Sequence, residues 1–370
     1  MELFASKLYH PVFLFLIIAL SILEYIVIRN DNGMKVLYKQ RSNWWMIILL
    51  IVLTIVLGLR PINYLFGDTV NYANTYQRAL DMAEVSFSRS GDWLFYFLMY
   101  ACSRVMGVNA FFLLIEFLYV FPIFFACIRF SRNNNALMML FCLGAFSFYT
   151  YAVNGIRNGM ACSLVLLAIS FIEGKPWQKL LCAVLCLLAI NFHHSTALPV
   201  LCMVAAFFIK SPRIMFIFWF ASIFVSLIGG DSVTGLFTSL GFDDRLDAYI
   251  LSQEDENTMA LFSRTGFRWD FLLYSVIPIA VGWYIIFKKK VYDKTYLLLL
   301  GTYMYSNAFW IMIIRAAYSN RFAYLSWFIY PIVLAYPFLK LPVWKNSQGQ
   351  KTGIALIGQV IITYLLWVLM

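Results

Sequence analysis

The sequence alternates long apolar runs with shorter polar connections along its whole length. Twelve runs stand out, and several have the ~20 residues that a helix needs to cross a bilayer. Spans this numerous are almost always α-helical, because a helix satisfies its own backbone groups in lipid. The runs lie near residues 11–28, 44–59, 110–128, 136–153, 157–172, 178–192, 195–209, 212–229, 270–287, 295–313, 322–339 and 354–369. The pattern predicts an all-α polytopic integral membrane protein that forms a single membrane domain over residues 1–370.

A further apolar segment, 92–106, is interrupted by Cys102-Ser103-Arg104. How it meets the membrane depends on the basic connections, which the positive-inside rule places in the cytoplasm. These connections are 29–41, 129–132, 173–179, 210–213, 288–294 and 340–351. These connections all lie on the cytoplasmic side only if residues 92–128 contribute one crossing in total. We therefore expect 92–106 to be re-entrant or to lie along the outer surface. The prediction is about 12 crossings with both termini outside.

The polar stretch 59–92 breaks the apolar pattern after the second run. Long polar connections in compact proteins are usually functional or disordered, and this one has too many aromatic residues for disorder. The longest polar insertion is 230–269, whose middle has the pattern of a short amphipathic helix. We expect the outer loops 60–91 and 230–269 to cap a membrane-embedded site and to bring polar groups to it.

Composition excludes a soluble protein, because 62% of the residues are hydrophobic and 12% are charged, against about 25% charged residues in soluble domains. The net charge of +10 would suit nucleic acid, but its distribution argues otherwise. The predicted cytoplasmic loops carry 12 lysines, five arginines and three acids, as the orientation of a membrane protein requires. We therefore expect no nucleic-acid partner.

Arginine dominates the other side. The predicted outer face carries Lys7, nine arginines and thirteen acids. A guanidinium group binds phosphate or carboxylate through two parallel hydrogen bonds, which lysine does not do. The set as a whole favours an anionic ligand on the outer face, while pairing with the outer acids is the alternative for any single arginine.

Four further groups of polar and aromatic residues lie at the same predicted membrane level as the 59–92 stretch. They read FYTYAVNGIRN at 148–158, NFHHST at 191–196, SRTGFRWD at 263–270 and RAAYSNRFAY at 315–324. Separate segments that converge at one leaflet are expected of a binding or catalytic site. Aromatic side chains there suit the stacking of sugar rings, although an interfacial aromatic belt is the alternative.

Other candidate sites are weaker. The pair His193-His194 lacks metal-ligand spacing and a nearby acid, so we expect no metal. Ser195 is expected to cap a helix and not to belong to a hydrolase triad. The seven cysteines lie in or beside apolar runs without CxxC spacing, as small buried residues do. Glu116 lies in mid-span, where a carboxylate usually has a role or a partner, and the sequence names neither.

Several short motifs occur in the order found in one known family. They are GLR…GD…Y…Y after the second run, N-x-I-R-N-x-x-A at 154–161, H-H-S-T-A at 193–197 and R…NRF-x-Y at 315–324. Over roughly residues 40–340 the chain resembles the EpsG/Wzy-like family of bacterial exopolysaccharide and O-antigen polymerases. Asn158 departs from the pattern, since family members typically have Gln there.

The resemblance implies a glycosyltransferase of the bacterial inner membrane with a GT-C-like architecture. Such an enzyme joins oligosaccharide repeat units carried on undecaprenyl diphosphate into exopolysaccharide, capsule or O-antigen, at the periplasmic or extracellular face. The reaction would invert the anomeric centre and would use no metal or other cofactor. Membrane lipid, flippase and chain-length regulator proteins would be its partners.

The candidate residues take three roles in that mechanism. The first group would hold the diphosphate: Arg60, Arg157, Arg264, Arg268, Arg315 and Arg321. The second group would supply the base that deprotonates the acceptor hydroxyl, namely His194 or His193, with Asp68 next. The third group would position the sugar: Tyr72, Tyr76, Asp92, Asn154 and Asp270.

Three other functions stay open. A transporter or flippase for the same lipid-linked sugars is expected to show inverted repeats, broken helices and charges at mid-membrane, and the sequence has no fixed-period repeat. An O-antigen ligase would use nearly the same site. A polysaccharide O-acetyltransferase would also employ paired histidines, although the arginine-rich outer face disfavours it.

Overall fold

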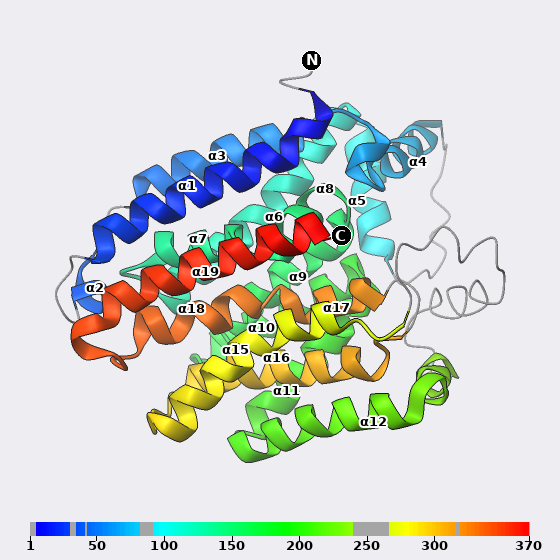
Figure 1. Ribbon diagram of the computed structural model, residues 1–370. Coiled ribbons are helices and arrows are strands. Elements are labelled where there is room, and N and C mark those ends of the chain that lie inside the picture. Colours follow the sequence, from blue (N-terminus) through cyan, green and yellow to red (C-terminus); the bar gives the residue numbers. More distant parts are fainter. Residues whose placement is uncertain are drawn as a thin grey trace. The chain divides into compact units, whose positions relative to one another are not determined.

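The computed structural model describes residues 5–29, 35–40, 43–81, 92–239, 266–315 and 319–369. Every regular element in these ranges is helical (Figure 1). The α-helices are α1 (Tyr9–Arg29), α2 (Lys35–Tyr38), α3 (Trp44–Gly58), α4 (Thr69–Asp81), α5 (Trp93–Ser103), α6 (Val108–Phe130), α7 (Asn135–Leu143), α8 (Phe146–Val153), α9 (Ile156–Ile169), α10 (Pro176–Phe192), α11 (Ala197–Phe208), α12 (Pro212–Ser239), α15 (Trp269–Trp283), α16 (Lys294–Met312), α17 (Ser319–Trp327), α18 (Tyr330–Lys340) and α19 (Gln348–Leu369). Short 3₁₀ turns cover Ser6–Leu8, Tyr64–Phe66, His194–Thr196 and Lys345–Ser347, and Tyr284–Lys288 is a π-helical turn. The all-α prediction is confirmed for the described residues.

The structure supports a multi-pass helical membrane protein with fewer full-length spans than the sequence predicts. Six described helical segments are long and apolar enough to cross a bilayer, or seven if the bent pair α7–α8 is one span. Four of the predicted runs form shorter apolar helices instead: α3, α9, α10 and α11. At 1.5 Å per residue such helices are about 18–26 Å long, less than the ~30 Å hydrocarbon core. The segment 92–106 forms α5, which is shorter still, and its place relative to the membrane stays a prediction.

The chain groups into two compact units. The first unit contains residues 1–196 and 335–370, and the second contains residues 197–334. In the first unit α1 packs along α19, and α9 packs against both α6 and α10 (Figure 1). In the second unit α16 packs against α11, α12 and α17. A single membrane domain and the capping of a site by the loops 60–91 and 230–269 stay predictions; residues 82–91 and 240–265 of those loops lie outside the described part of the chain.

A sharp bend divides the predicted run 136–153 into α7 and α8, whose axes differ by 71°. The bend follows Gly144, because Ala145 takes an extended backbone conformation. Two side chains of α19 bind the carbonyls released there: Gln359 Nε2 donates to Phe141 O at 2.6 Å and Thr363 Oγ1 donates to Gly144 O at 2.8 Å. Backbone groups inside a membrane protein need such partners, so α19 stabilises the bend.

The second unit is held together by a buried polar network. Asn307 on α16 donates to Ser275 Oγ of α15 at 3.2 Å and to Ser326 Oγ of α17 at 3.0 Å. Its Oδ1 accepts from Trp219 Nε1 of α12 at 2.9 Å. All four residues are at most 3% exposed. Interhelical hydrogen bonds of this kind hold membrane helices together where the hydrophobic effect contributes little.

Candidate functional site

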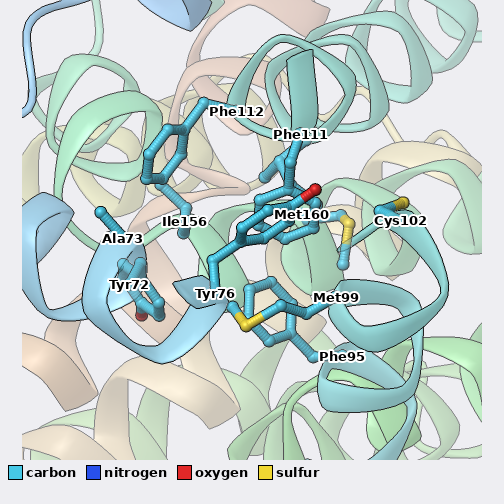
Figure 2. Packing of buried hydrophobic residues seen from close by; sticks show 11 residues of the cluster. Tyr72, Ala73, Tyr76, Phe95, Met99, Cys102, Phe111, Phe112, Ile156 and Met160 are labelled. Carbon is cyan, nitrogen blue, oxygen red and sulfur yellow. The ribbon is translucent and has the colours of Figure 1, made fainter. Parts of the chain in front are cut away.

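An apolar cluster fastens α4 and α5 to α6 and α9 in the first unit (Figure 2). Its buried members are Tyr72, Ala73, Tyr76, Phe95, Met99, Cys102, Phe111, Phe112, Ile115, Ile156 and Met160. The helix α4 is polar overall but buries one face, since Tyr72, Tyr76 and Ala79 recur at helical spacing. This packing brings the start of α5 and the start of α9 to α4, and the polar residues at those ends form the site.

Arg157 lies in the first turn of α9 and is only 9% exposed. Its Nη1 donates to Asp92 Oδ2 at 2.7 Å and to the Tyr96 hydroxyl at 3.0 Å, and its Nε donates to the Tyr72 hydroxyl at 3.1 Å. The rings of Tyr72, Tyr96 and Phe95 lie 5.6–5.8 Å from Cζ, within the range of cation–π attraction. Within the described residues Nη2 makes no hydrogen bond, so one edge of the guanidinium remains for an anion.

Asp92 immediately precedes α5 and accepts hydrogen bonds from two other segments, the start of α9 and the junction after α10. Besides Arg157, the His194 backbone N–H donates to Oδ1 at 2.9 Å, and His193 Nδ1 lies 3.3 Å from Oδ1 and 3.2 Å from Oδ2. Burial alone would raise the pKa of this carboxyl group, but the His193 hydrogen bond, the charge of Arg157 and the His194 N–H together hold the pKa well below its usual range. Asp92 is therefore ionised at neutral pH and acts as an acceptor of hydrogen bonds.

The two adjacent histidines have different surroundings. His193 is the C-terminal capping residue of α10 and is partly buried, and its ring faces Asp92. His194 begins the following 3₁₀ turn, and its residue is exposed. Thr196 fixes this junction, because its hydroxyl donates to the His193 carbonyl at 2.7 Å. Of the two bases that the sequence leaves open, His193 is the one bound to the carboxylate.

The motif residue Asn154 positions the beginning of α4. Its Oδ1 accepts the Asp68 N–H at 2.9 Å. Gly67 lies against the same oxygen: a Cβ there would be 2.3 Å from Asn154 Oδ1, and φ is +60°, so only glycine fits. The Asp68 carboxylate accepts from Asn71 Nδ2 at 3.2 Å. Asp68 and Asn154 thus make hydrogen bonds that join the 59–92 stretch to the α8–α9 junction.

Arg60 is 2% exposed and its donors bind the protein itself. Nη1 donates to Leu57 O at 2.8 Å, Nη2 donates to Val153 O at 3.1 Å, and both Nε and Nη2 reach Thr69 Oγ1 at 3.3 and 3.2 Å. The guanidinium also lies 5.2 Å from the Phe112 ring. These contacts tie the end of α3 to α4 and to the end of α8. A role of Arg60 toward a diphosphate stays a prediction.

Tyr76 is fully buried in the apolar cluster, where its hydroxyl donates to Met106 O at 2.6 Å. Tyr96 belongs to the site and was not among the sequence candidates. The sequence could have indicated Tyr96 through its spacing, because it follows Asp92 by four residues and residues four apart share one face of a helix. A hydrogen bond from Trp93 Nε1 to Asn191 Oδ1 also joins the start of α5 to α10.

The remaining candidates belong to the second unit. Arg268 and Asp270 form a bidentate ion pair, with Nε–Oδ1 and Nη2–Oδ2 distances of 3.0 and 2.7 Å. Arg315 follows α16, and Arg321 is an exposed residue of α17. Arg264 lies outside the described residues. The structure therefore brings Arg157, Asp92, His193 and Tyr72 together, with Asn154 and Asp68 making the neighbouring loop contact.

Glu116 is buried in the middle of α6, and its Oε1 has no hydrogen-bond partner among the described residues. The positive charge of Arg60 acts on the Glu116 carboxyl group. The residues that the structure describes contain no group of three or more His, Cys, Asp or Glu side chains that could hold a metal ion. The first unit brings together an imidazole bound to a carboxylate and a guanidinium whose Nη2 makes no hydrogen bond among the described residues.

Comparison with known proteins agrees with the resemblance noted in the motifs. The model of the EpsG family matches residues 43–370. Searches of curated proteins and of solved structures found no match. Since the matched segment covers most of the sequence and includes the whole Arg157–Asp92–His193 cluster, the chain belongs to the EpsG family.

Proposed function

We propose that this protein is a membrane glycosyltransferase that polymerises oligosaccharide repeat units carried on undecaprenyl diphosphate. The observation that carries the proposal is the Arg157–Asp92–His193 cluster, assembled from three separate segments in a member of the EpsG family. Membership of that family supports polysaccharide polymerisation as the activity. The product would be exopolysaccharide, capsule or O-antigen, formed at the outer face of a bacterial inner membrane.

Arg157 has the properties that a diphosphate leaving group requires. The free Nη2 edge can donate two hydrogen bonds to phosphate oxygens, and burial strengthens the attraction between the two charges. Charge develops on the diphosphate as its bond to the anomeric carbon breaks, and a preorganised cation stabilises that charge. Arg268, Arg315, Arg321 and Arg264 remain candidates for further contacts. In this proposal the arginines supply the positive charge and no metal is required.

His193 is the proposed base. The acceptor hydroxyl loses its proton to Nε2 of the imidazole while its oxygen forms a bond to the anomeric carbon. The bond from that carbon to the diphosphate oxygen breaks on the opposite side, and its electron pair stays on the diphosphate. Attack opposite the leaving group inverts the anomeric centre. Tyr72 and Tyr96, whose hydroxyls accept from Arg157, would contact the sugar in this proposal.

The test is product analysis with purified protein and lipid-linked repeat units. The wild type is expected to yield a ladder of lengthening glycans, and Arg157→Ala and His193→Ala are expected to lower the rate by about 100-fold or more, as loss of a preorganised donor or a general base does. Arg129→Ala is the matched control, because Arg129 is exposed and binds the Ser170 carbonyl at 2.9 Å, at the other end of α6. Transfer of glycan to a non-repeat acceptor, without a ladder, would identify a ligase.

Transport of lipid-linked sugars is the second candidate, and the bent pair α7–α8 favours it because broken helices line transporter sites. The α7–α8 residues near the bend are buried and their freed carbonyls are bound by α19, so they are not available to a substrate. Vesicles that contain the protein distinguish the two functions. Intact substrate that crosses the membrane without elongation would replace the polymerase proposal with a transporter.

A further inference from the structure

Asp92 is the residue that binds both groups of the proposed chemistry, the Arg157 guanidinium and the His193 imidazole. One carboxylate accepts from Arg157 Nη1, from the His194 backbone and from His193 Nδ1. These donors come from α9 and from the junction after α10, while Asp92 itself begins α5. The Asp92 side chain is only 10% exposed, so little water is available to replace these partners.

We propose that Asp92 is a positioning residue that fixes the proton of His193 on Nδ1 and holds the Arg157 guanidinium with its Nη2 edge free. The proposal rests on the proposed function for its catalytic meaning. Asp92 itself contacts neither the sugar nor the diphosphate in this scheme. This replaces the sugar-binding role that the sequence assigned to it.

The proton on His193 follows from the acceptor character of the carboxylate. An ionised carboxylate has no proton to donate, so the ring nitrogen that faces it carries the N–H. A neutral imidazole has one N–H, and the hydrogen bond at Nδ1 therefore leaves the lone pair on Nε2. That nitrogen is the one able to take the proton of an acceptor hydroxyl.

The same carboxylate leaves the anion-binding edge of Arg157 unused. Asp92 and Tyr96 occupy Nη1, and Tyr72 occupies Nε. A buried cation without a counter-charge is costly, so Asp92 makes it possible to keep Arg157 desolvated before the diphosphate arrives. One side chain thus sets the geometry of both the base and the leaving-group site.

The substitution Asp92→Asn separates this role from simple structural support. An asparagine that donates its amide N–H to Nδ1 would move the histidine proton to Nε2 and remove the base. The kcat for elongation should fall about 100-fold or more, as when the wrong histidine tautomer is imposed in a catalytic triad, while KM for the lipid-linked donor changes less. Asp92→Ala, which imposes neither tautomer, should be no worse in kcat than Asp92→Asn. A structural role predicts the opposite order, because asparagine preserves the shape.

A spectroscopic measurement tests the inference without any activity. The chain has only three histidines, so ¹⁵N-histidine labelling of the full protein gives few signals, and His193→Gln assigns the one of interest. We expect the neutral ring to carry its proton on Nδ1 in the wild type and on Nε2 in Asp92→Asn. Asp293→Asn is the control, since Asp293 caps α16 through the Tyr296 N–H at 2.8 Å.

The outcomes separate the inference from the function. A wild-type ladder with an unaffected Asp92→Asn variant overturns the positioning role and leaves the polymerase standing. Absence of a ladder in the wild type overturns the polymerase, while the histidine spectra still decide the tautomer. A wild-type His193 that carries its proton on Nε2 overturns the inference in either case.

Discussion

Arg60 and Arg157 carry the same charge and belong to the same unit, yet their surroundings differ. The Arg60 donors bind two backbone carbonyls and Thr69, whereas Arg157 binds one carboxylate and two tyrosine hydroxyls and keeps Nη2 free. The sequence assigned both to a diphosphate because residue type and predicted leaflet are the same. Hydrogen-bond partners separate them, and these partners lie up to 93 positions away along the chain.

Arg60→Lys is expected to lower stability more than catalysis. Lysine cannot reproduce the fork that reaches Leu57, Thr69 and Val153 together, and unpaired buried carbonyls cost about 1–3 kcal/mol each. Thermal unfolding in detergent should therefore occur at a clearly lower temperature than in the wild type, while the elongation rate per folded molecule changes little. Arg129→Lys is the control at an exposed arginine. An unchanged melting temperature with lost elongation would instead assign Arg60 to the substrate.

At the scale of single residues, the sequence was sufficient to select Arg157, Asp92, His193 and Tyr72 as candidates, because polar residues at the ends of apolar runs are few. It did not separate His193 from His194. Adjacent residues have the same hydropathy environment, and only the packing of α10 against α5 determines which ring faces Asp92. Roles toward a substrate remain predictions for all of them.

Helices follow the apolar runs closely, but breaks within a run are invisible to hydropathy. The predicted run 44–59 corresponds to Trp44–Gly58, and 178–192 corresponds to Pro176–Phe192. The run 136–153 gave no sign of a 71° bend, because a change of backbone conformation at Ala145 leaves the apolar pattern intact. The polar residues that stabilise the bend belong to α19, where Gln359 and Thr363 stand out in an apolar helix.

Gln359→Leu should destabilise the bend. The substitution keeps the size of the side chain but leaves the Phe141 carbonyl without its donor, which costs about 1–3 kcal/mol in a buried site. A lower unfolding temperature and faster proteolysis between α7 and α8 are the expected results. Gln350→Leu, at an exposed position of the same helix, is the control. If both variants unfold like the wild type, the bend does not depend on α19.

For the whole molecule, composition and periodicity predicted the class correctly, and the family that the motifs resemble is confirmed by the family model. The division into two compact units was not predicted. Hydropathy describes each helix against lipid and says nothing about which helices contact one another. The number of crossings was predicted as about 12, and the short lengths of α3, α9, α10 and α11 reduce the number of full-length spans.

The predicted orientation can be tested with single cysteines. The native cysteines are all buried, so a membrane-impermeant maleimide should report mainly on introduced ones. Tyr64→Cys, at a residue 75% exposed in the 59–92 stretch, should react in intact cells once any outer barrier is removed. Lys289→Cys, in a lysine-rich connection, should react only after the cytoplasmic membrane is opened. The reverse pattern would place the Arg157–Asp92–His193 cluster on the cytoplasmic side.

The hydrogen bonds from α19 to the bend also set a time order for biosynthesis. Phe141 and Gln359 are 218 positions apart, and Gly144 and Thr363 are 219 apart. At the ~5–20 residues per second of protein synthesis, the two carbonyls wait about 10–40 seconds for their donors. During that interval the growing chain must keep unpaired backbone groups inside a nearly complete first unit. The helix α19 therefore completes the unit that holds Arg157 after the other helices of that unit have been made, and a ribosome that stalls before α19 leaves the unit incompletely assembled in the membrane.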